Sequence, residues 1–214
     1  KFNGMWAFAL WDKTKQILFL SRDRIGEKPL HYSVYNNSFV FGSEMKSLFA
    51  YGVPKTPDFS LLEVYLVLTN IPEPHTFYKD IKKLKAGHYL IVKPEGIKEY
   101  KYWDLPEIDE SNMIKDKKFV YNQFEALFRD AVKIRMRSDV PYGAFLSGGL
   151  DSSSIVSVMS QHSKFPVNTF TIGFPEKAFD ESKLALEVAN KFKTNHFRGT
   201  IEPDNFEEIL NRIA

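Results

Sequence analysis

The sequence has 214 residues, of which 43% are hydrophobic and 26% are charged, a composition typical of a soluble globular protein with one large or two modest domains. Its net charge of +2 is too small to favour nucleic acid or an anionic membrane as a partner. The absence of cysteine excludes disulfides, cysteine-ligated metals and a cysteine nucleophile within these residues. Because there is neither a signal-peptide pattern nor an apolar run long enough to span a membrane, we expect a piece of a cytoplasmic enzyme.

The first part of the chain has short apolar and aromatic runs separated by turn-like clusters, a spacing that predicts antiparallel strands. These runs cover residues 5–10, 17–20, 30–34 and 39–41. A short helix is expected at 43–50, and a second one at 60–69 with Ser60 as its N-cap and Glu63 completing a capping box. A hairpin over 87–103 follows. This part is therefore predicted to be β-rich.

The polar stretch 106–118 is the best candidate for a linker, so the sequence predicts one domain at 1–105 and another at 119–214. Beyond the linker, apolar residues recur with a helical period. Strands at 142–146, 167–172 and 195–198 then alternate with helices near 153–162, 181–192 and 206–213, which predicts an α/β domain with a parallel sheet. Since 142–146 is apolar at nearly every position, we expect both faces of that strand to be covered.

The most informative motif is SGGLDSS at 147–153, which lies between that strand and the next helix. Its two glycines let the backbone approach a ligand closely, and the N-terminus of the helix favours a phosphate group. The hydroxyls of Ser147, Ser152 and Ser153 add donors. Asp151 beside a polyphosphate needs a cation between them, which predicts it as a Mg²⁺ ligand. The alternative is an ordinary Gly-Gly turn in which Asp151 or a serine only caps the helix.

The SGGLDSS motif resembles the pyrophosphate loop (PP-loop) of N-type ATP pyrophosphatases, which split ATP between its α and β phosphates. In the N-terminal part, RDRIGEKPLHY at 22–32 and FGSEMKSL at 41–48 are similar to a signature of glutamine-hydrolysing asparagine synthetases. SDVPYG at 138–143 and FDES at 179–182 also fit that family. The resemblance implies an α+β, Ntn-type class II glutamine amidotransferase domain, followed by an α/β, HUP-like PP-loop synthetase domain.

The resemblance also implies roles for particular residues. Asp23 matches the aspartate that holds the α-amino group of glutamine; the alternative is a solvated turn residue paired with Arg22 or Arg24. Phe145 and Ile172 match positions whose backbone contacts the adenine of ATP, although their side chains fit a plain strand core as well. The matches to the phosphate loop are Ser147, Gly148, Gly149, Asp151 and Ser152.

The reaction that the resemblance implies is amidation of aspartate through β-aspartyl-AMP, with glutamine as the nitrogen donor, ATP and Mg²⁺ as cofactors, and a homodimer as a possible assembly. The family's N-terminal cysteine nucleophile, its other glutamine-binding segments and its downstream catalytic residues are absent, so we expect an internal fragment without glutaminase activity of its own. The alternatives are a relative that amidates a sugar uronate, a β-lactam-type ring closer, or a non-catalytic nucleotide-binding or structural piece. Retention of Asp23 disfavours the ring closer.

Overall fold

The computed structural model describes residues 2–178 and 180–200. The chain divides into two compact units, residues 1–110 and 111–214, and this division falls within the stretch 106–118. The first unit contains antiparallel sheets and the second a parallel sheet, so the predicted change from a β-rich part to an α/β part is confirmed. None of the described helices is long and apolar enough to span a membrane.

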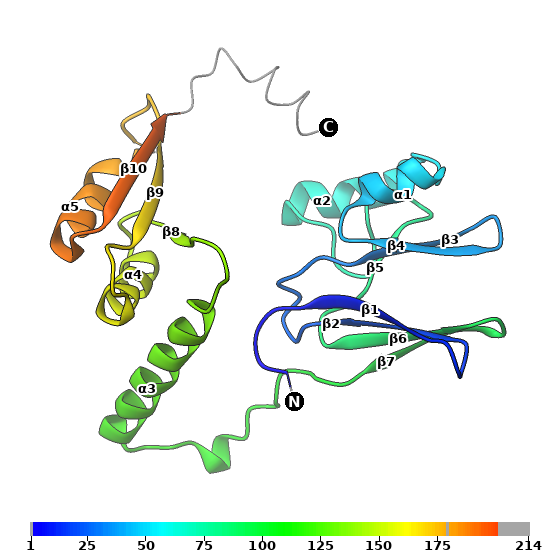
Figure 1. Cartoon of the computed structure of the whole chain (residues 1–214), viewed down its shortest axis with the longest axis horizontal. Coiled ribbons are helices and arrows are strands. Elements are labelled where there is room, and N and C mark those ends of the chain that lie inside the picture. Colours follow the sequence, from blue (N-terminus) through cyan, green and yellow to red (C-terminus); the bar gives the residue numbers. More distant parts are fainter. Residues whose placement is uncertain (1, 179, 201–214) are drawn as a thin grey trace. The chain divides into compact units, whose positions relative to one another are not determined.

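The first unit has three layers, with two helices over a small sheet and the small sheet over a larger one (Figure 1). The larger sheet has the strand order β1-β2-β6-β7, and the smaller has the order β4-β3-β5. The strands are β1 (Ala7–Asp12), β2 (Ile17–Arg22), β3 (His31–Tyr35), β4 (Ser38–Gly42), β5 (Lys82–Lys83), β6 (His88–Lys93) and β7 (Gly96–Lys101). The helices are α1 (Met45–Tyr51), η1 (Phe59–Leu61) and α2 (Leu62–Leu68), and a short 3₁₀ turn, η2 (Glu110–Asn112), follows the last strand.

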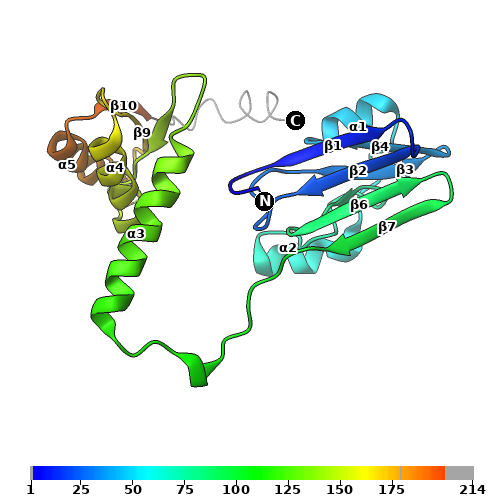
Figure 2. The ribbon, with the colours of Figure 1, turned by 60° about the horizontal axis from the view of Figure 1, so that its bottom comes forward.

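The core of the first unit lies between its two sheets. Leu20 of β2 and Leu90 of β6 are paired across the larger sheet, and both are fully buried against Tyr32 of β3. The four strands of the larger sheet lie side by side in Figure 2. Period-2 alternation along β2 and β6 therefore directs one set of apolar side chains into the space between the sheets.

The predicted start of the helix at 60–69 is wrong in detail. The segment begins as the 3₁₀ turn η1, and its N-cap is Asp58 rather than Ser60. The carboxylate of Asp58 accepts hydrogen bonds from the backbone N–H of Ser60 at 3.2 Å and from its hydroxyl at 2.6 Å. Because the Ser60 hydroxyl is engaged with Asp58, it does not form the predicted capping box with Glu63.

The second unit alternates helices and parallel strands, with the strand order β10-β9-β8. Its elements are α3 (Lys117–Arg135), β8 (Gly143–Phe145), α4 (Leu150–His162), β9 (Asn168–Gly173), α5 (Ser182–Phe192) and β10 (Asn195–Thr200). Leu146, Val156 of α4 and Ala185 of α5 form one buried cluster, so both helices pack on the same face of the sheet. The helix predicted at 206–213 lies outside the described residues.

The prediction that both faces of strand 142–146 are covered is wrong. Leu146 is buried, but the side chain of Phe145 is 81% exposed. Within the described residues β8 is an edge strand, and its helices α4 and α5 cover only the face toward which Leu146 points. Phe170 and Ile172 of β9 are likewise half exposed, so the opposite face of this sheet is open in the described part of the chain.

Candidate functional site

A pocket of about 310 Å³ lies where β8 and β9 end. Four of the seven predicted ATP-binding residues line it: Phe145, Ser147, Ser152 and Ile172. The remaining lining residues are Leu146, Phe170, Thr171, Phe174 and Glu181. Because loops at the carboxyl ends of parallel strands form the usual ligand site of an open α/β sheet, the position of this pocket is that of a binding site.

Strand pairing fixes the start of the 147–153 loop. Phe145 of β8 pairs with Phe170 of β9, and the N–H of Leu146 donates to the carbonyl of Phe170 at 2.9 Å. The hydroxyl of Thr171 donates to the carbonyl of Leu146. Both polar groups of residue 146 are thereby bound to β9, so the loop that follows leaves the sheet in a defined direction.

Serine hydroxyls hold the loop in a compact turn. The Oγ atoms of Ser147 and Ser152 lie 3.1 Å apart. Ser147 Oγ accepts from the N–H of Gly149, and Ser152 Oγ donates to the carbonyl of Gly149, each at 3.3 Å. These two hydroxyls also line the pocket, and a hydroxyl can exchange a weak internal partner for a phosphate oxygen.

The first glycine of the loop meets a strict steric requirement. Gly148 has φ = +83°, and a Cβ atom at this position would lie 2.5 Å from the Cβ of Leu184 in α5. Gly149 is the N-cap of α4 at φ = −68°, and no side chain caps that helix. Neither Asp151 nor a serine is therefore the N-cap that the alternative interpretation expected, and no capping side chain stands between the first N–H groups of α4 and a ligand.

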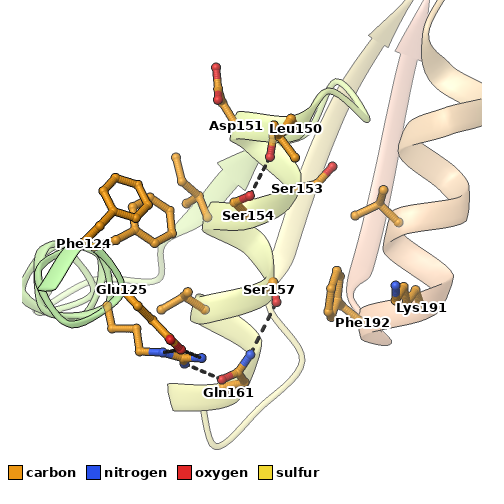
Figure 3. Close-up of a pocket in the computed structure, with 15 residues that line it drawn as sticks. Phe124, Glu125, Leu150, Asp151, Ser153, Ser154, Ser157, Gln161, Lys191 and Phe192 are labelled. Atoms are coloured by element: carbon orange, nitrogen blue, oxygen red, sulfur yellow. Dashed lines mark hydrogen bonds and ion pairs between the residues drawn. The ribbon is translucent and has the colours of Figure 1, made fainter. Parts of the chain in front are cut away.

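Asp151 occupies a different side of the loop from the two serines. It is exposed in the first turn of α4, and it lines a second pocket of about 720 Å³ between α3, α4 and α5. Figure 3 shows its carboxylate at the N-terminal end of α4, pointing away from the aromatic rings of Phe124 and Phe192. No group of three or more His, Asp and Glu residues suited to a metal occurs in the described residues. Mg²⁺ at Asp151 would therefore need further oxygen ligands, such as those of a bound polyphosphate.

Asp23 lies in the first unit and is fully buried. Its carboxylate accepts hydrogen bonds from the backbone N–H groups of Trp6 at 3.2 Å, Glu27 at 2.9 Å and Lys28 at 3.0 Å. Burial alone would raise the pKa of Asp23, but these backbone donors, together with that of Ile25, outweigh burial and lower the pKa below its ordinary value. The alternative of a solvated turn residue paired with a neighbouring arginine is therefore wrong.

Comparison with known proteins follows the same two-part division. Residues 1–103 match the family described as a glutamine amidotransferase domain, and residues 123–214 match the family described as asparagine synthase. A relative from Methanocaldococcus jannaschii, named as a glutamine-hydrolysing asparagine synthetase, is 43% identical over 100% of this chain and 42% of its own length. Asparagine synthetase 1 of Bacillus subtilis is 34% identical over 100% of this chain and 33% of its own length. This chain belongs to the glutamine-hydrolysing asparagine synthetase family.

The chain spans less than half of these asparagine synthetase relatives. A relative with a different name, the amidase chyE of Penicillium rubens, is 34% identical over 88% of this chain and 30% of its own length. A solved structure, glutamine phosphoribosylpyrophosphate amidotransferase of B. subtilis complexed with ADP and GMP, covers 92% of this chain and 35% of that chain. Its TM-score of 0.27 and identity of 13% are too low to support a fold assignment.

Reasoning from the sequence missed some residues that line the pocket or lie beside Asp23. Phe170 and Glu181 line the pocket at the loop, but only the register between β8 and β9 and the start of α5 bring them there. The partly buried ion pair between Arg22 and Glu73, beside Asp23, was also missed. Arg22 stands next to Asp23 in the sequence, and this was its only signal. Glu73 lies 51 residues from Arg22 along the chain, so no sequence signal linked the two residues.

Proposed function

We propose that the protein catalyses ATP-dependent amidation of aspartate to asparagine, with glutamine as the nitrogen donor and AMP and pyrophosphate as products. The observation that carries this proposal is the order of two domain matches in one chain, a glutamine amidotransferase domain followed by asparagine synthase. The first unit would carry part of the site that releases ammonia from glutamine, and the second would carry part of the site that activates aspartate as β-aspartyl-AMP.

We assign ATP to the pocket at the ends of β8 and β9. The phosphates would lie against Ser147, Gly149 and Ser152, where the free N–H groups at the start of α4 and the helix dipole favour negative charge. The adenine would lie toward Phe145 and Ile172 at the other side of the same pocket. The close approach of Gly148 to α5 supports this assignment, because it brings the backbone of the loop to a position that a side chain would block.

Asp151 is the residue that would hold Mg²⁺, which when bound neutralises charge on the phosphates. A single exposed carboxylate fits a cation that keeps several waters and takes its remaining ligands from substrate phosphates. The assignment of Asp23 to the α-ammonium of glutamine stays a prediction from the family resemblance: the residue is fully buried, and its carboxylate is already bound by three backbone N–H groups.

The finer fold assignments are also part of this proposal. The sandwich of two antiparallel sheets in residues 1–105 fits an Ntn-type glutaminase domain, and the parallel sheet in 119–214 fits a PP-loop domain of HUP-like fold, joined by 106–118. A homodimer and a cytoplasmic location stay predictions from the family resemblance.

A second candidate function is amidation of a different carboxylic acid. The relative named amidase chyE, at 34% identity over 88% of this chain, shows that similar sequences carry names other than asparagine synthetase. In that case the ATP and glutamine sites would serve the same chemistry, and only the acceptor would differ. The acceptor is decided by experiment.

The test uses the natural full-length protein with Mg·ATP and glutamine, and measures AMP release in the presence of aspartate or of other carboxylic acids. The proposal predicts AMP and asparagine in equal amounts with aspartate. AMP release that depends on another carboxylate, with none for aspartate, would favour the second candidate. Formation of ADP instead of AMP would contradict both, because a PP-loop enzyme splits ATP between its α and β phosphates.

A further inference from the structure

Asp180 lies just before helix α5, and its carboxylate links three elements of the second unit. Oδ1 accepts from the backbone N–H of Ser182, the first residue of α5, at 3.1 Å. Oδ2 lies 3.4 Å from Nη2 of Arg198 on β10. The backbone N–H of Phe174, which follows β9, also donates to this carboxylate. One side chain thus joins the end of β9, the start of α5 and β10.

These partners keep the carboxylate of Asp180 charged at neutral pH. The hydroxyl and the backbone N–H of Ser182 lower the pKa of Asp180 most. The charge of Arg198 and the N–H of Phe174 lower it further, and together they outweigh the partial burial that would raise it. A charged carboxylate has two acceptor oxygens, so it can serve the helix, the arginine and the end of β9 at the same time.

The ion pair of Asp180 and Arg198 lies directly against the last residue of β9. A Cβ atom on Gly173 would lie 2.9 Å from both Nε and Nη2 of Arg198, and 3.1 Å from Oδ1 of Asp180. A side chain at residue 173 would therefore displace the ion pair from the backbone. Glycine at this position lets the carboxylate reach the main chain that leads from Ile172 to Phe174.

The elements that Asp180 joins form walls of the pocket at the ends of β8 and β9. Ile172 and Phe174 line this pocket from the β9 side, and Glu181 lines it from the start of α5. Asp180 is not one of the lining residues. It therefore acts on the pocket through its hydrogen-bond partner Phe174 and through its neighbour Glu181.

The 147–153 loop rests on the same end of α5. The backbone of Gly148 lies so close to this helix that a Cβ atom there would be 2.7 Å from the backbone nitrogen of Ala185. The N–H of Ala185 in turn donates to the carbonyl of Glu181 at 3.1 Å. The start of α5 is thus the surface that supports the loop, and Asp180 ties this surface to the end of β9.

Stabilisation of helix α5 alone does not account for these contacts. A carboxylate that only stabilises a helix needs only the N–H groups of that helix. The ion pair adds little net stability, because the side chain of Arg198 is 51% exposed. The hydrogen bond from Phe174 serves neither purpose, since it connects the helix to a strand. What it does provide is a fixed separation of α5 and β9 where the pocket lies.

We propose that Asp180 is a positioning residue for ATP, which holds the end of β9 and the start of α5 at the separation that lets one nucleotide reach both Ile172 and the 147–153 loop. This inference rests on the proposed function, since it assumes that ATP occupies this pocket. Asp180 itself does not contact the nucleotide. Its loss therefore weakens ATP binding and leaves the use of glutamine by the first unit unchanged.

The experiment compares Asp180→Ala with the parent in the natural full-length protein, with Asp116→Ala as a matched control. Asp116 is the N-cap of α3 in the same unit, and its carboxylate accepts from two backbone N–H groups of that helix. It does not line the pocket at the ends of β8 and β9. The Kd of Mg·ATP is measured by isothermal titration calorimetry. KM for ATP and KM for glutamine are measured from AMP release, with the carboxylic acid that the parent amidates.

Asp180→Ala is expected to raise both Kd and KM for ATP about tenfold or more, because the end of β9 and the start of α5 lose their shared acceptor. KM for glutamine is expected to stay within about twofold of the parent. Asp180→Asn, which keeps one acceptor oxygen, is the second variant and is expected to raise Kd and KM for ATP by a smaller factor. Asp116→Ala is expected to keep all three constants within about twofold of the parent.

A purely structural role gives a different result. Partial unfolding would lower the amount of active protein, so kcat would fall while Kd and KM for ATP stayed at the parent's values, and that outcome in both Asp180 variants would overturn the proposal. Hydrogen exchange at the N–H of Phe174 gives a second readout that needs no activity. Exchange there is expected to be faster in Asp180→Ala and unchanged in Asp116→Ala. Equal rates in Asp180→Ala and the parent would also overturn the proposal.

The binding measurement separates this proposal from the proposed function. A parent that binds no Mg·ATP would overturn both. If the parent binds Mg·ATP but releases no AMP with any carboxylic acid, the proposed function fails and the Kd values alone decide the role of Asp180. If the parent releases AMP and the Asp180 variants keep its Kd and KM for ATP, only the positioning role fails.

Discussion

Arg22 and Asp23 bind the backbone carbonyl and the backbone N–H of the same residue, Lys28. The Nε of Arg22 donates to the carbonyl of Lys28 at 2.7 Å, and the Oδ2 of Asp23 accepts from its N–H at 3.0 Å. Asp23 thus binds the backbone N–H that lies five residues further along the chain. Arg22, which has the opposite charge, binds the backbone carbonyl that lies six residues further along. These two charges hold the segment 22–28 in shape, although its sequence is typical of an exposed turn.

Asp23→Asn is expected to destabilise the first unit by about 2–3 kcal/mol, because an amide nitrogen replaces a carboxylate oxygen that accepts backbone N–H groups in a buried place. The measurement is urea unfolding of the chain followed by tryptophan fluorescence, since Trp6, Trp11 and Trp103 all lie in residues 1–110. Asp12→Asn is the control: Asp12 also accepts two backbone N–H groups at 2.9 Å, but in an exposed turn, so its loss is expected to cost less than about 1 kcal/mol. Equal effects of the two changes would show that the burial of Asp23 is unimportant.

Stability of the first unit is also expected to fall in mild acid because of His31. This residue is 8% exposed, and its Nδ1 lies 3.0 Å from the carbonyl of Ser43. Burial lowers the pKa of His31 most; the hydrogen bond to Ser43 and the charge of Glu73 oppose this, and the charges of Lys83 and Arg22 add to it. Since the unfolded chain takes up the proton first, stability is full above the ordinary pKa of 6.5 and declines as pH falls below that value.

The measurement is the urea midpoint from tryptophan fluorescence at pH 7.5 and at pH 5.5. The decline in the midpoint is expected to be smaller in His31→Gln than in the parent. His75→Gln, a change at an exposed histidine of the same unit, is expected to show the parent's full decline. A parent-like decline in His31→Gln would rule out His31 as the cause.

The elements of both units follow from local sequence patterns, but their contacts do not. Short apolar runs between turn-like clusters predicted β2, and a hairpin pattern predicted β6. The strand β5 has only two residues, Lys82–Lys83, and is too short for any such pattern to show. The N-cap is Asp58 and not the predicted Ser60. Two suitable capping residues lie within three positions of each other, and only their geometry decides between them. The exposure of Phe145 depends on which face α4 and α5 cover, which is a property of the assembled sheet.

The same distinction holds at the sites. Residues 147–153 are contiguous, so the phosphate loop could be predicted from one motif placed between a strand and a helix. Phe170 reaches the pocket through its pairing with Phe145, and Glu73 reaches Arg22 across 51 residues. Neither pairing leaves a periodic or spacing signal in a single sequence, and this is why both residues were missed.

Asp151→Asn in the natural full-length protein is expected to reduce ATP-dependent amide formation strongly and to leave glutamine hydrolysis nearly intact. Loss of a carboxylate that holds Mg²⁺ beside a polyphosphate removes stabilisation on the order of several kcal/mol. The measurement is AMP release beside glutamate release, with Asp130→Asn, an exposed carboxylate on α3, as the control. AMP release within about threefold of the parent would show that Asp151 has no such role.

Gly148→Ala is expected to destabilise the second unit and to abolish ATP-dependent amide formation, while Gly149→Ala is tolerated in stability. At Gly148 alanine would need φ = +83°, which costs about 1–2 kcal/mol, and its Cβ would lie 2.5 Å from Leu184 Cβ and 2.7 Å from the backbone nitrogen of Ala185. Since those atoms belong to α5, either the loop or the helix has to move. At Gly149, φ = −68° suits any residue, and the nearest atom to a Cβ is Ser147 Oγ at 3.3 Å, the movable end of a side chain.

The measurement of stability is thermal unfolding followed by far-UV circular dichroism, together with hydrogen exchange in α5. We expect Gly148→Ala to lose about 2 kcal/mol or more and to show faster exchange at the start of α5, and Gly149→Ala to stay within about 1 kcal/mol of the parent. Activity is then compared in the natural full-length protein at a temperature where both variants are folded. Because the loop is placed by Gly148 against α5, a folded Gly148→Ala with parent-like AMP release would mean that this close approach is not needed for the reaction.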